Sequence, residues 1–592
     1  MDELNIKMNE SLIRDGDAWL HFADPDRIIV AETLADVLTA LREVERLTQI
    51  NGWYAAGFLS YEAAPAFDSA FQTRSSLHST ETNEFPYLWF GLYPKPRTIA
   101  LPEPARPQKP LNWLASTDPD TYNSAIASIK DHIAEGRTYQ VNYTMRLQAD
   151  FTGNAWEFFL ELAQSQNNHG AYIQTERHVI CSASPELFFQ LDGTTITCRP
   201  MKGTAKRGRT TREDRAQSEW LKHSIKNRAE NVMIVDMIRN DLGRIAKVGS
   251  VSVSRLFEIE RYPTLWQMTS TIDARTEALL PEIFGALFPS ASITGAPKIS
   301  TMNIIAELEN SPRKMYTGSI GYILPGRKAK FNVAIRTAVI DRARQIAEYG
   351  IGGGIVWDST STDEYAEARL KAQVLIQQHP VFALLETLLW TREKGYFLRD
   401  QHIARMLDSA NYFDIPASAE KLQTYLNQIC EHFIRPQRVR VTLDQSGKLD
   451  FEAKPFDLTE SDALLKASIA KEPIDSSNFF LFHKTTQRDV YESAREGFEE
   501  FDDVLLYNEL SELTEFTIGN LVVELNGRLL TPFVSSGVLP GTFRAHLLET
   551  GQIAEGTIKL EQLGNCTKLF RVNSIRKWQQ VEIQERAAEP TS

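Results

Sequence analysis

The clearest short-range pattern in the chain is a pair of strand-like segments joined by a tight turn. Ser184–Leu191 and Thr194–Arg199 are rich in β-branched and aromatic residues, which is typical of strands. The dipeptide Asp192-Gly193 between them is a signal for a two-residue hairpin turn. With that turn, we expect Glu186 in the first strand to lie opposite Arg199 in the second.

Lys202 follows this hairpin, between Met201 and Gly203. A strand rises about 3.3 Å per residue, so Lys202 is expected roughly 10 Å along from Glu186, a gap that suits a small cyclic substrate. A lysine in this place can serve as an amine nucleophile or as a cation that faces a substrate. The alternative is an ordinary ion pair at a strand end on a solvated surface.

Two longer segments show the apolar spacing of helices. Arg212–Leu242 is predicted as one helix that carries Glu230. A second helix is predicted over Asp363–Ile376, where three charged residues are spaced to share one face: Glu364, Glu367 and Lys371. Such a face is ordinarily a solvated set of ion pairs. Its two glutamates and one from the other helix would also form an oxygen site suited to Mg²⁺.

Glycine-rich runs lie near these helices. Glu348–Ile355 is interpreted as a loop before the second helix, and Ser292–Lys298 opens another helix. Glycine allows backbone N–H groups to approach an anion, and a helix N-terminus adds positive potential, although tight turns explain most such runs. Arg336 lies in the apolar segment Ala334–Thr337, predicted as a strand, where an arginine needs a partner such as a carboxylate.

The pattern changes near residue 380. After Gln377–Pro380, the segment Phe382–Thr387 starts a new strand pattern, so we divide the chain into domains 1–378 and 379–592. No internal repeat relates the two halves. The second half carries five isolated polar residues, each unremarkable by itself: Arg405 on an amphipathic helix, Lys484 after an apolar run, Glu515, Thr542 at a helix start, and Ser574.

Length and composition narrow the class of protein. A chain of 592 residues is too long for one core. Its net charge of −13, with no basic cluster, argues against a nucleic-acid partner. We expect no signal peptide and no membrane span. The four cysteines are scattered, as in reduced cytoplasmic proteins, and none lies in a glutaminase motif.

Over residues 1–376 the chain resembles the chorismate-utilising enzymes. The matching motifs are long: Gly57–Glu62, Tyr139–Asn142, Ser184–Glu186, Arg239–Gly243, Thr294–Lys298 and Tyr316–Tyr322. The resemblance implies an α+β fold of large antiparallel sheets with helices, and Mg²⁺ held by Glu230, Glu364 and Glu367. It also implies that chorismate is bound by the following set: Thr294, Gly295, Tyr316, Arg336, Gly352, Gly353, Gly354 and Lys371.

Two positions favour one subfamily. The water-using members place a lysine base where this chain has Gln140, and anthranilate synthases have alanine where it has Lys202. The chain therefore resembles component I of the aminodeoxychorismate synthases, in which the lysine is proposed to attack C2 and the glutamate matching Glu186 to act as general acid. Anthranilate synthase component I remains an alternative. Gln267 and Asn227 depart from the residues usual in relatives.

Residues 382–580 resemble the class IV aminotransferases of pyridoxal-phosphate (PLP) fold type IV, an α/β domain, and among them aminodeoxychorismate lyase. By that resemblance Lys484 is the catalytic Schiff-base lysine and Glu515 pairs with the pyridinium nitrogen. The phosphate would be bound by Arg405, Thr542 and Ser574.

Together the two resemblances imply a bifunctional enzyme of folate biosynthesis. Chorismate and ammonia would give 4-amino-4-deoxychorismate, and elimination of pyruvate would then give 4-aminobenzoate. A separate glutaminase subunit would supply the ammonia, and a homodimer could form through the C-terminal domain. The alternatives are a C-terminal domain that is an ordinary transaminase, or one that is catalytically silent and only dimerises.

Overall fold

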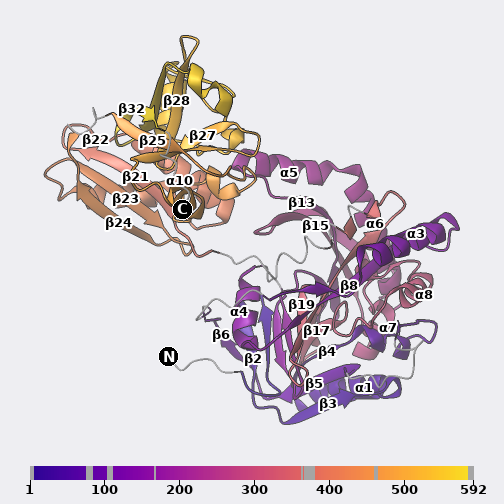
Figure 1. The fold of residues 1–592 in the computed structure, drawn as a ribbon. Coiled ribbons are helices and arrows are strands. Elements are labelled where there is room, and N and C mark those ends of the chain that lie inside the picture. The colour runs from indigo at the N-terminus through magenta and orange to yellow at the C-terminus, as the bar shows by residue number, and fades with distance from the viewer. Residues whose placement is uncertain are drawn as a thin grey trace. The chain divides into compact units, whose positions relative to one another are not determined.

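The computed structural model describes residues 6–584 apart from 75–84, 103, 105–110, 166–168, 362–363, 366–367, 369–379 and 459–463. The chain forms two compact units (Figure 1). The first unit comprises Met1–Lys206 and Ser218–His379, and the second comprises Arg207–Gln217 and Pro380–Ser592. Within the described residues, no helix is both long and apolar enough to cross a membrane.

The first sheet of the first unit has ten strands, and all of its pairings are antiparallel. Its strands run in this spatial order: β16 (Gly295–Ala296), β8 (Gln140–Asp150), β20 (Ile346–Ile355), β19 (Thr337–Asp341), β10 (His178–Ser182), β9 (Ala171–Gln174), β1 (Ser11–Asp15), β2 (Ala18–Phe22) and β6 (Arg97–Ile99), with β7 (Leu114–Ala115) beside β8.

The second sheet also has ten antiparallel strands. Their order is: β13 (Met201–Lys206), β15 (Leu265–Arg275), β12 (Thr195–Arg199), β11 (Leu187–Asp192), β18 (Lys328–Val333), β17 (Ser319–Leu324), β4 (Tyr54–Leu59), β5 (Leu88–Tyr93) and β3 (Arg27–Ala31), with β14 (Ser252–Arg261) beside β15.

Six described helices lie wholly in this unit: α1 (Leu34–Asn51), α3 (Pro119–Ala134), α4 (Ala155–Ser165), α6 (Ile225–Gly243), α7 (Leu280–Leu287) and α8 (Lys298–Leu308). Helix α5 (Thr211–His223) is divided between the two units. One apolar cluster joins α1, α6 and α7 to the second sheet, and another joins α3, α4 and α8 to the first. A third cluster lies between the sheets, where Ile13 and Phe22 of one pack with Phe58 and Ile320 of the other. The sheets therefore stack face to face, and helices cover their outer faces.

The helices follow from apolar spacing and from capping. In α1 the buried residues Val37, Leu41 and Val44 recur at intervals of four and three, which forms one apolar stripe. The helix ends at Gly52, whose φ of 72° is easily adopted only by glycine.

The single helix predicted over Arg212–Leu242 is wrong. Ser224 breaks it, with an extended ψ of 113° and a side chain that accepts a hydrogen bond from Asn227 N. Serine is a strong N-cap because its hydroxyl satisfies a free backbone N–H of the first turn. The chain therefore forms α5, ends it at His223, and starts α6 at Ile225.

The predicted hairpin is present, but its register is displaced. Asp192 pairs with Thr195, so the turn residues are Gly193 and Thr194, and Gly193 has a φ of 60°. An irregularity between Leu187 and Gln190 shifts the pairing again, and Arg199 lies opposite Leu187 rather than Glu186. A bulge inserts an unpaired residue into one strand, which turn chemistry alone does not predict.

Two other local predictions are also wrong. The glycine run Glu348–Ile355 is not a loop but belongs to strand β20, which pairs along its length with β8. Arg336 does not lie on a strand; it lies between β18 and β19 with a φ of 51°. A glycine-rich strand permits close approach of other groups to its backbone, so its composition reflects packing rather than a turn.

The second unit contains two sheets. The smaller is antiparallel, in the order: β22 (Gly395–Tyr396), β21 (Leu384–Thr391), β23 (Gln437–Leu443) and β24 (Leu449–Pro455). Helices α10 (Arg399–Phe413) and α11 (Ala419–Cys430) bury Met406 and Leu422 against its central strands.

The larger sheet is mixed, and β25 is parallel to both of its neighbours. Its order is: β27 (Leu513–Phe516), β26 (Asp503–Tyr507), β25 (Leu465–Ile469), β32 (Lys577–Ile583), β31 (Lys568–Asn573), β28 (Gly519–Leu525), β29 (Arg528–Thr531) and β30 (Ala554–Glu555). Because β27 also pairs with β28, the strands from β27 to β28 form a closed ring. Helices α12 (Asp489–Arg495) and α13 (Thr542–Glu549) accompany this sheet.

Candidate functional sites

Glu186 lies at the start of β11, where the chain enters the second sheet. Its side chain is 3% exposed, and its Oε1 accepts a hydrogen bond of 2.6 Å from Ser292 Oγ. Burial raises the pKa of Glu186 to about 7, against the opposing effects of the Ser292 hydrogen bond and the charge of Lys202. A carboxyl group that is half protonated near neutral pH is suited to general acid catalysis.

Lys202 is half-buried on β13, and side chains of other elements donate hydrogen bonds to the backbone at this point of the strand. Asn231 Nδ2 donates to its carbonyl oxygen at 3.4 Å, and Gln267 Nε2 donates to the carbonyl of Gly203 at 2.8 Å. Gly203 has a φ of 95°, and a Cβ there would lie 3.0 Å from Asn227 Cβ. Gln267 and Asn227, the two residues that differ from those usual in relatives, thus both contact Gly203, which follows Lys202 on β13.

The amine of Lys202 lies beside Gln140 and Gly354. A Cβ added to Gly354 would lie 2.2 Å from Gln140 Nε2 and 3.4 Å from Lys202 Nζ. A larger residue at this point of β20 would displace the Gln140 side chain, and the structure brings three residues together that are far apart in sequence. The position that holds a lysine base in water-using relatives is here an amide next to the amine of Lys202.

The remaining residues predicted to bind substrate come from neighbouring segments. Thr294 is fully buried and its carbonyl accepts from Asn142 N at 2.8 Å. Gly295, with a φ of 143°, lies so close to β8 that a Cβ would be 2.0 Å from Gln140 O. On β20, a Cβ at Gly352 would be 2.3 Å from Tyr143 O, and Gly353 pairs with Tyr143.

Tyr316 and Arg336 add an aromatic ring and a cation. The Tyr316 ring lies against Gly350, where a Cβ would be 2.1 Å away, and under the Arg146 guanidinium at 5.2 Å. Among the described residues, Arg336 Nη1 is buried without a hydrogen-bond partner. Burial lowers the pKa of Arg336. A buried N–H of this kind is normally satisfied, so this one suits the carboxylate of a ligand.

The predicted metal ligands are only partly described. Glu230 on α6 is half-buried, and Glu364 accepts a 2.6 Å hydrogen bond from Ser359 Oγ. Glu367 and Lys371 lie outside the described residues. Within the part of the chain that is described, no group of three His, Cys, Asp or Glu side chains could hold a metal ion. The Mg²⁺ site stays a prediction that rests on the carboxylates of Glu230 and Glu364.

In the second unit, Lys484 lies between cations and carboxylates. Burial lowers the pKa of Lys484 to about 8; Arg405 and Arg488 lower it further, whereas Glu386 and Glu515 oppose them. A lysine with this pKa has a substantial neutral fraction near physiological pH, which a nucleophilic amine requires.

Glu515 is held rigidly by three donors. Tyr491 Oη donates to Oε1 at 2.9 Å, Leu539 N donates to Oε1 at 3.2 Å, and Asn520 Nδ2 donates to Oε2 at 2.9 Å. Burial raises the pKa of Glu515 to about 7 even though these bonds lower it. A carboxylate fixed in this way can accept a proton or pair with a cationic ring nitrogen.

Arg405 is clamped by a carboxylate that the sequence did not reveal. Its Nε and Nη2 donate to the two oxygens of Glu386 at 2.8 and 2.6 Å. His402 Nδ1 lies 2.6 Å from the same carboxylate, and its Nε2 lies 3.3 Å from Thr542 Oγ1. Burial opposes ionisation, but Arg405 and His402 hold the pKa of Glu386 at about 2.

The predicted phosphate-binding residues therefore meet around β21. Thr542 is the first residue of α13, where backbone N–H groups are free for an anion. Ser574 Oγ donates to Thr387 O, next to Glu386, at 3.3 Å. His402 and Arg405 are three residues apart on one helix, and this spacing could have identified His402 as part of the site. Nothing in the sequence pointed to Glu386, Tyr491 or Asn520.

The comparisons with known proteins agree with this geometry. Residues 11–377 match the family described as chorismate binding enzyme, and residues 383–583 match amino-transferase class IV. The first match covers more than half of the chain, so the chain belongs to the chorismate binding enzyme family. It joins a domain of that family to a class IV aminotransferase domain, and the predicted α+β fold class is confirmed.

Two relatives are more specific. Aminodeoxychorismate synthase component 1 of Escherichia coli K12 is 37% identical over 270 residues, which are 45% of this chain and 59% of that protein. Aminodeoxychorismate synthase of Streptomyces griseus is 33% identical over 388 residues, 64% of this chain and 48% of that protein. The chain thus spans about half to three fifths of the length of these relatives.

A solved structure has the same fold. Anthranilate synthase component I from Streptococcus pneumoniae TIGR4 has a TM-score of 0.53 and 24% identity, across 64% of this chain and 94% of that one.

Proposed function

We propose that the first domain converts chorismate and ammonia to 4-amino-4-deoxychorismate. The observation that carries the proposal is the amine of Lys202 beside Gln140 and Gly354, with the carboxyl of Glu186 near enough to be influenced by its charge. The relatives named as aminodeoxychorismate synthases support the same reaction. The alternative product, anthranilate, is disfavoured because its synthases have alanine at the position of Lys202.

The residues present suit a two-stage substitution. The neutral amine of Lys202 attacks C2 of chorismate, both ring double bonds shift by one position, and the 4-hydroxyl leaves as water with a proton from Glu186. Ammonia then adds at C4, both double bonds shift back, the lysine amine leaves C2, and the new ammonium group returns a proton to Glu186. Arg336 offers its free N–H to a substrate carboxylate. A magnesium ion held by Glu230, Glu364 and Glu367 would neutralise carboxylate charge.

We propose further that the second domain eliminates pyruvate from this product to give 4-aminobenzoate. Class IV aminotransferases use PLP, which supplies an electron sink when bound. With PLP bound, Lys484 would move the proton at C4 of 4-amino-4-deoxychorismate, Glu515 would pair with the ring nitrogen of the cofactor, and Arg405, Thr542 and Ser574 would hold its phosphate. The depressed pKa of Lys484, about 8, supports its role as the base.

Partner and location follow from the same proposal. None of the four cysteines lies in a glutaminase motif, so ammonia comes from a separate glutaminase subunit and the pure chain uses ammonium salts but not glutamine. The enzyme acts in the cytoplasm, in folate biosynthesis, and a homodimer would form through the C-terminal domain.

The deciding experiment is product analysis of the purified chain with chorismate and an ammonium salt. We expect 4-aminobenzoate and pyruvate. Accumulation of 4-amino-4-deoxychorismate alone would identify a transaminase or a silent C-terminal domain, and anthranilate would overturn the synthase assignment. An absorbance scan for the PLP–lysine chromophore separates a silent domain from an active one.

A further inference from the structure

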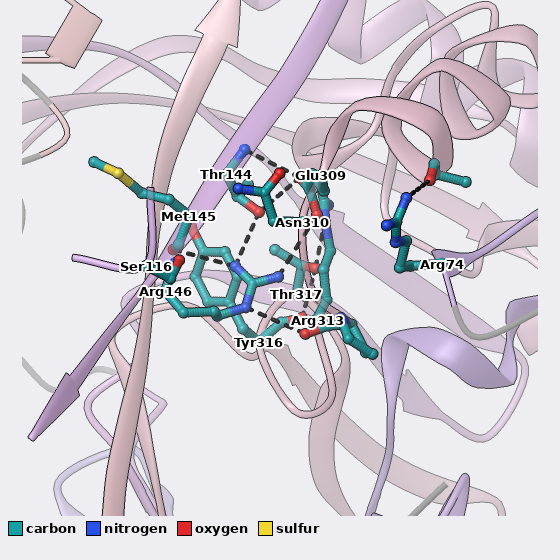
Figure 2. Close-up of polar contacts among 12 residues, drawn as sticks. Arg74, Ser116, Thr144, Met145, Arg146, Glu309, Asn310, Arg313, Tyr316 and Thr317 are labelled. Atoms are coloured by element: carbon teal, nitrogen blue, oxygen red, sulfur yellow. Dashed lines mark hydrogen bonds and ion pairs between the residues drawn. The ribbon is translucent and has the colours of Figure 1, made fainter. Parts of the chain in front are cut away.

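A buried cluster of charges lies directly behind the Tyr316 ring (Figure 2). Arg146 of β8 and Arg313, in the turn after α8, are each 1% exposed, and Glu309 is 3% exposed. Charges this deep must be paired and hydrogen-bonded to be tolerated. The cluster is therefore an arrangement with defined partners rather than a solvated group of ions.

Glu309 fixes Arg313 in place. Its carboxylate accepts from Arg313 Nε at 3.0 Å and from Arg313 Nη2 at 2.6 Å. It also accepts from Thr144 N at 3.0 Å and from Thr144 Oγ1 at 2.7 Å. Because the carboxylate is itself anchored to β8, the plane of the Arg313 guanidinium has little freedom.

The other donors of Arg313 reach three separate segments. Nη1 donates to Ile293 O at 3.0 Å and to Thr317 Oγ1 at 3.3 Å, and Nη2 donates to Asn142 O at 2.7 Å. Ile293 precedes Thr294 and Gly295, Asn142 follows Gln140 on β8, and Thr317 follows Tyr316. Two of these segments thus carry residues predicted to bind chorismate, and the third carries Gln140, which lies beside the amine of Lys202.

Thr317 shows that one of these segments is under strain. Its φ is 61°, a left-handed conformation that is unfavourable for a β-branched residue. Its N–H donates to Ala334 O at 2.8 Å, and its hydroxyl donates to Tyr316 O at 2.6 Å. Arg313 contributes the remaining contact to this hydroxyl, so it helps to hold the backbone that sets the direction of the Tyr316 ring.

We propose that Arg313 is a positioning residue that fixes the Ile293, Asn142 and Thr317 segments relative to one another and so shapes the chorismate site. The inference rests on the proposed function of the first domain. A planar guanidinium can bind a carboxylate and several carbonyl groups at once, whereas a lysine offers three donors at a single point. A lysine at this position therefore keeps the positive charge beside Glu309, but it cannot hydrogen-bond to the Ile293, Asn142 and Thr317 segments at the same time.

The test compares Arg313→Lys with Arg327→Lys in the full-length chain. Arg327 also joins several carbonyls, those of Gly193, Thr276 and Ala278, but none belongs to the predicted site. We expect Arg313→Lys to raise the KM for chorismate and its dissociation constant by roughly 10- to 100-fold, because small displacements of binding groups have effects of this size. Arg327→Lys should leave both constants near those of the wild type.

A second pair of variants decides the matter if Arg313→Lys does not fold. Thr317→Val removes the hydroxyl and keeps the shape, whereas Thr317→Ser keeps the hydroxyl. We expect Thr317→Val to bind chorismate more weakly than Thr317→Ser, with the melting temperatures of both measured as a control for folding. A wild-type chain that does not bind chorismate overturns the proposed function; an active wild type with equal constants in the paired variants overturns only the role of Arg313.

Discussion

The two candidate sites of this chain each pair a lysine with a buried glutamate, yet they are built in different ways. Glu186 has one side-chain donor, Ser292, and a backbone hydrogen bond from Met201, whereas Glu515 has two side-chain donors, Tyr491 and Asn520, and the backbone donor Leu539. Burial nevertheless raises the pKa of both to about 7. A carboxyl group with a single side-chain donor can release its proton to a substrate, whereas one fixed by side chains on both oxygens is suited to a permanent cationic partner. The same pKa therefore does not mean the same role.

The surroundings differ as well. The first site is made by close backbone approach, with glycine at 295 and 352, where a Cβ would collide with the backbone of β8. The second is made by charge, with Glu386 held ionised between Arg405 and His402. The close packing of the first site is suited to selecting a ligand by its shape. The charges of the second site are suited to binding an anionic group.

The largest expected effect is the loss of the first nucleophile. Lys202→Ala should slow formation of 4-amino-4-deoxychorismate by about 10⁴-fold or more, the scale seen when a catalytic nucleophile is removed. PLP binding by the second domain should persist, as measured by absorbance. Lys206→Ala, at an exposed position of the same strand, is the control. Undiminished turnover by Lys202→Ala would remove the proposed nucleophile.

Loss of Lys484 should separate the synthase activity of the first domain from the lyase activity of the second. Lys484→Ala should lower the release of 4-aminobenzoate by at least about 10²–10⁴-fold, since the general base is absent, and 4-amino-4-deoxychorismate should accumulate. Chromatography of the products measures both, with the exposed Lys466→Ala as control. Release of 4-aminobenzoate at the wild-type rate would show that the second domain is not the lyase.

Metal removal should affect only the first site. Treatment with EDTA should reduce synthase turnover by roughly 100-fold, because a divalent cation contributes several kcal/mol of charge stabilisation, and added Mg²⁺ should restore it. Glu364→Gln should behave similarly. Elimination of pyruvate from supplied 4-amino-4-deoxychorismate should be unchanged. Full synthase activity of Glu364→Gln in EDTA would contradict the metal site.

The pH dependence should separate the two glutamates. The general acid must be protonated, and the pKa of Glu186 is about 7, so the ratio of wild-type to Glu186→Gln synthase turnover should be level below pH 7. Above pH 7 this ratio should fall toward a tenfold loss per unit, whereas the pH dependence of Lys202 and of ammonia is common to both proteins and cancels. The elimination step should lack this limb, because Glu515 is needed as the anion. A ratio that does not fall between pH 7 and 9 would exclude Glu186 as the acid.

The smallest expected effect tests the clamp formed by Glu386, whose carboxylate accepts two hydrogen bonds from Arg405. Glu386→Gln keeps one hydrogen bond to Arg405 and loses the charge, which should weaken PLP binding by about 1.5 kcal/mol, or roughly tenfold. Titration with PLP followed by absorbance measures the change. The control is Glu452→Gln, at an exposed position on β24 of the same sheet. Equal PLP affinity in the two variants would show that the clamp does not orient Arg405.

Much of this protein could be predicted from its sequence because the information is local. The hairpin that precedes Lys202, the helix that carries Arg405 and the helix that starts at Thr542 depend on short-range spacing and turn chemistry, and the structure contains all three, with the hairpin turn displaced by one residue. The motifs along the first half and the ordered polar residues of the second half were sufficient to indicate both families, and the family matches bear this out.

Other features were decided only by the tertiary structure. The bulge that places Arg199 opposite Leu187, the strand formed by the glycines of β20, and the left-handed Arg336 depend on what packs against them. The same holds for Glu386, which stays ionised when buried only because folding brings Arg405 and His402 to it, and for Arg313, whose partners lie up to 251 residues away. Long-range contacts of this kind leave no spacing in the sequence, because burial and charge pairing are properties of residues brought together by the fold.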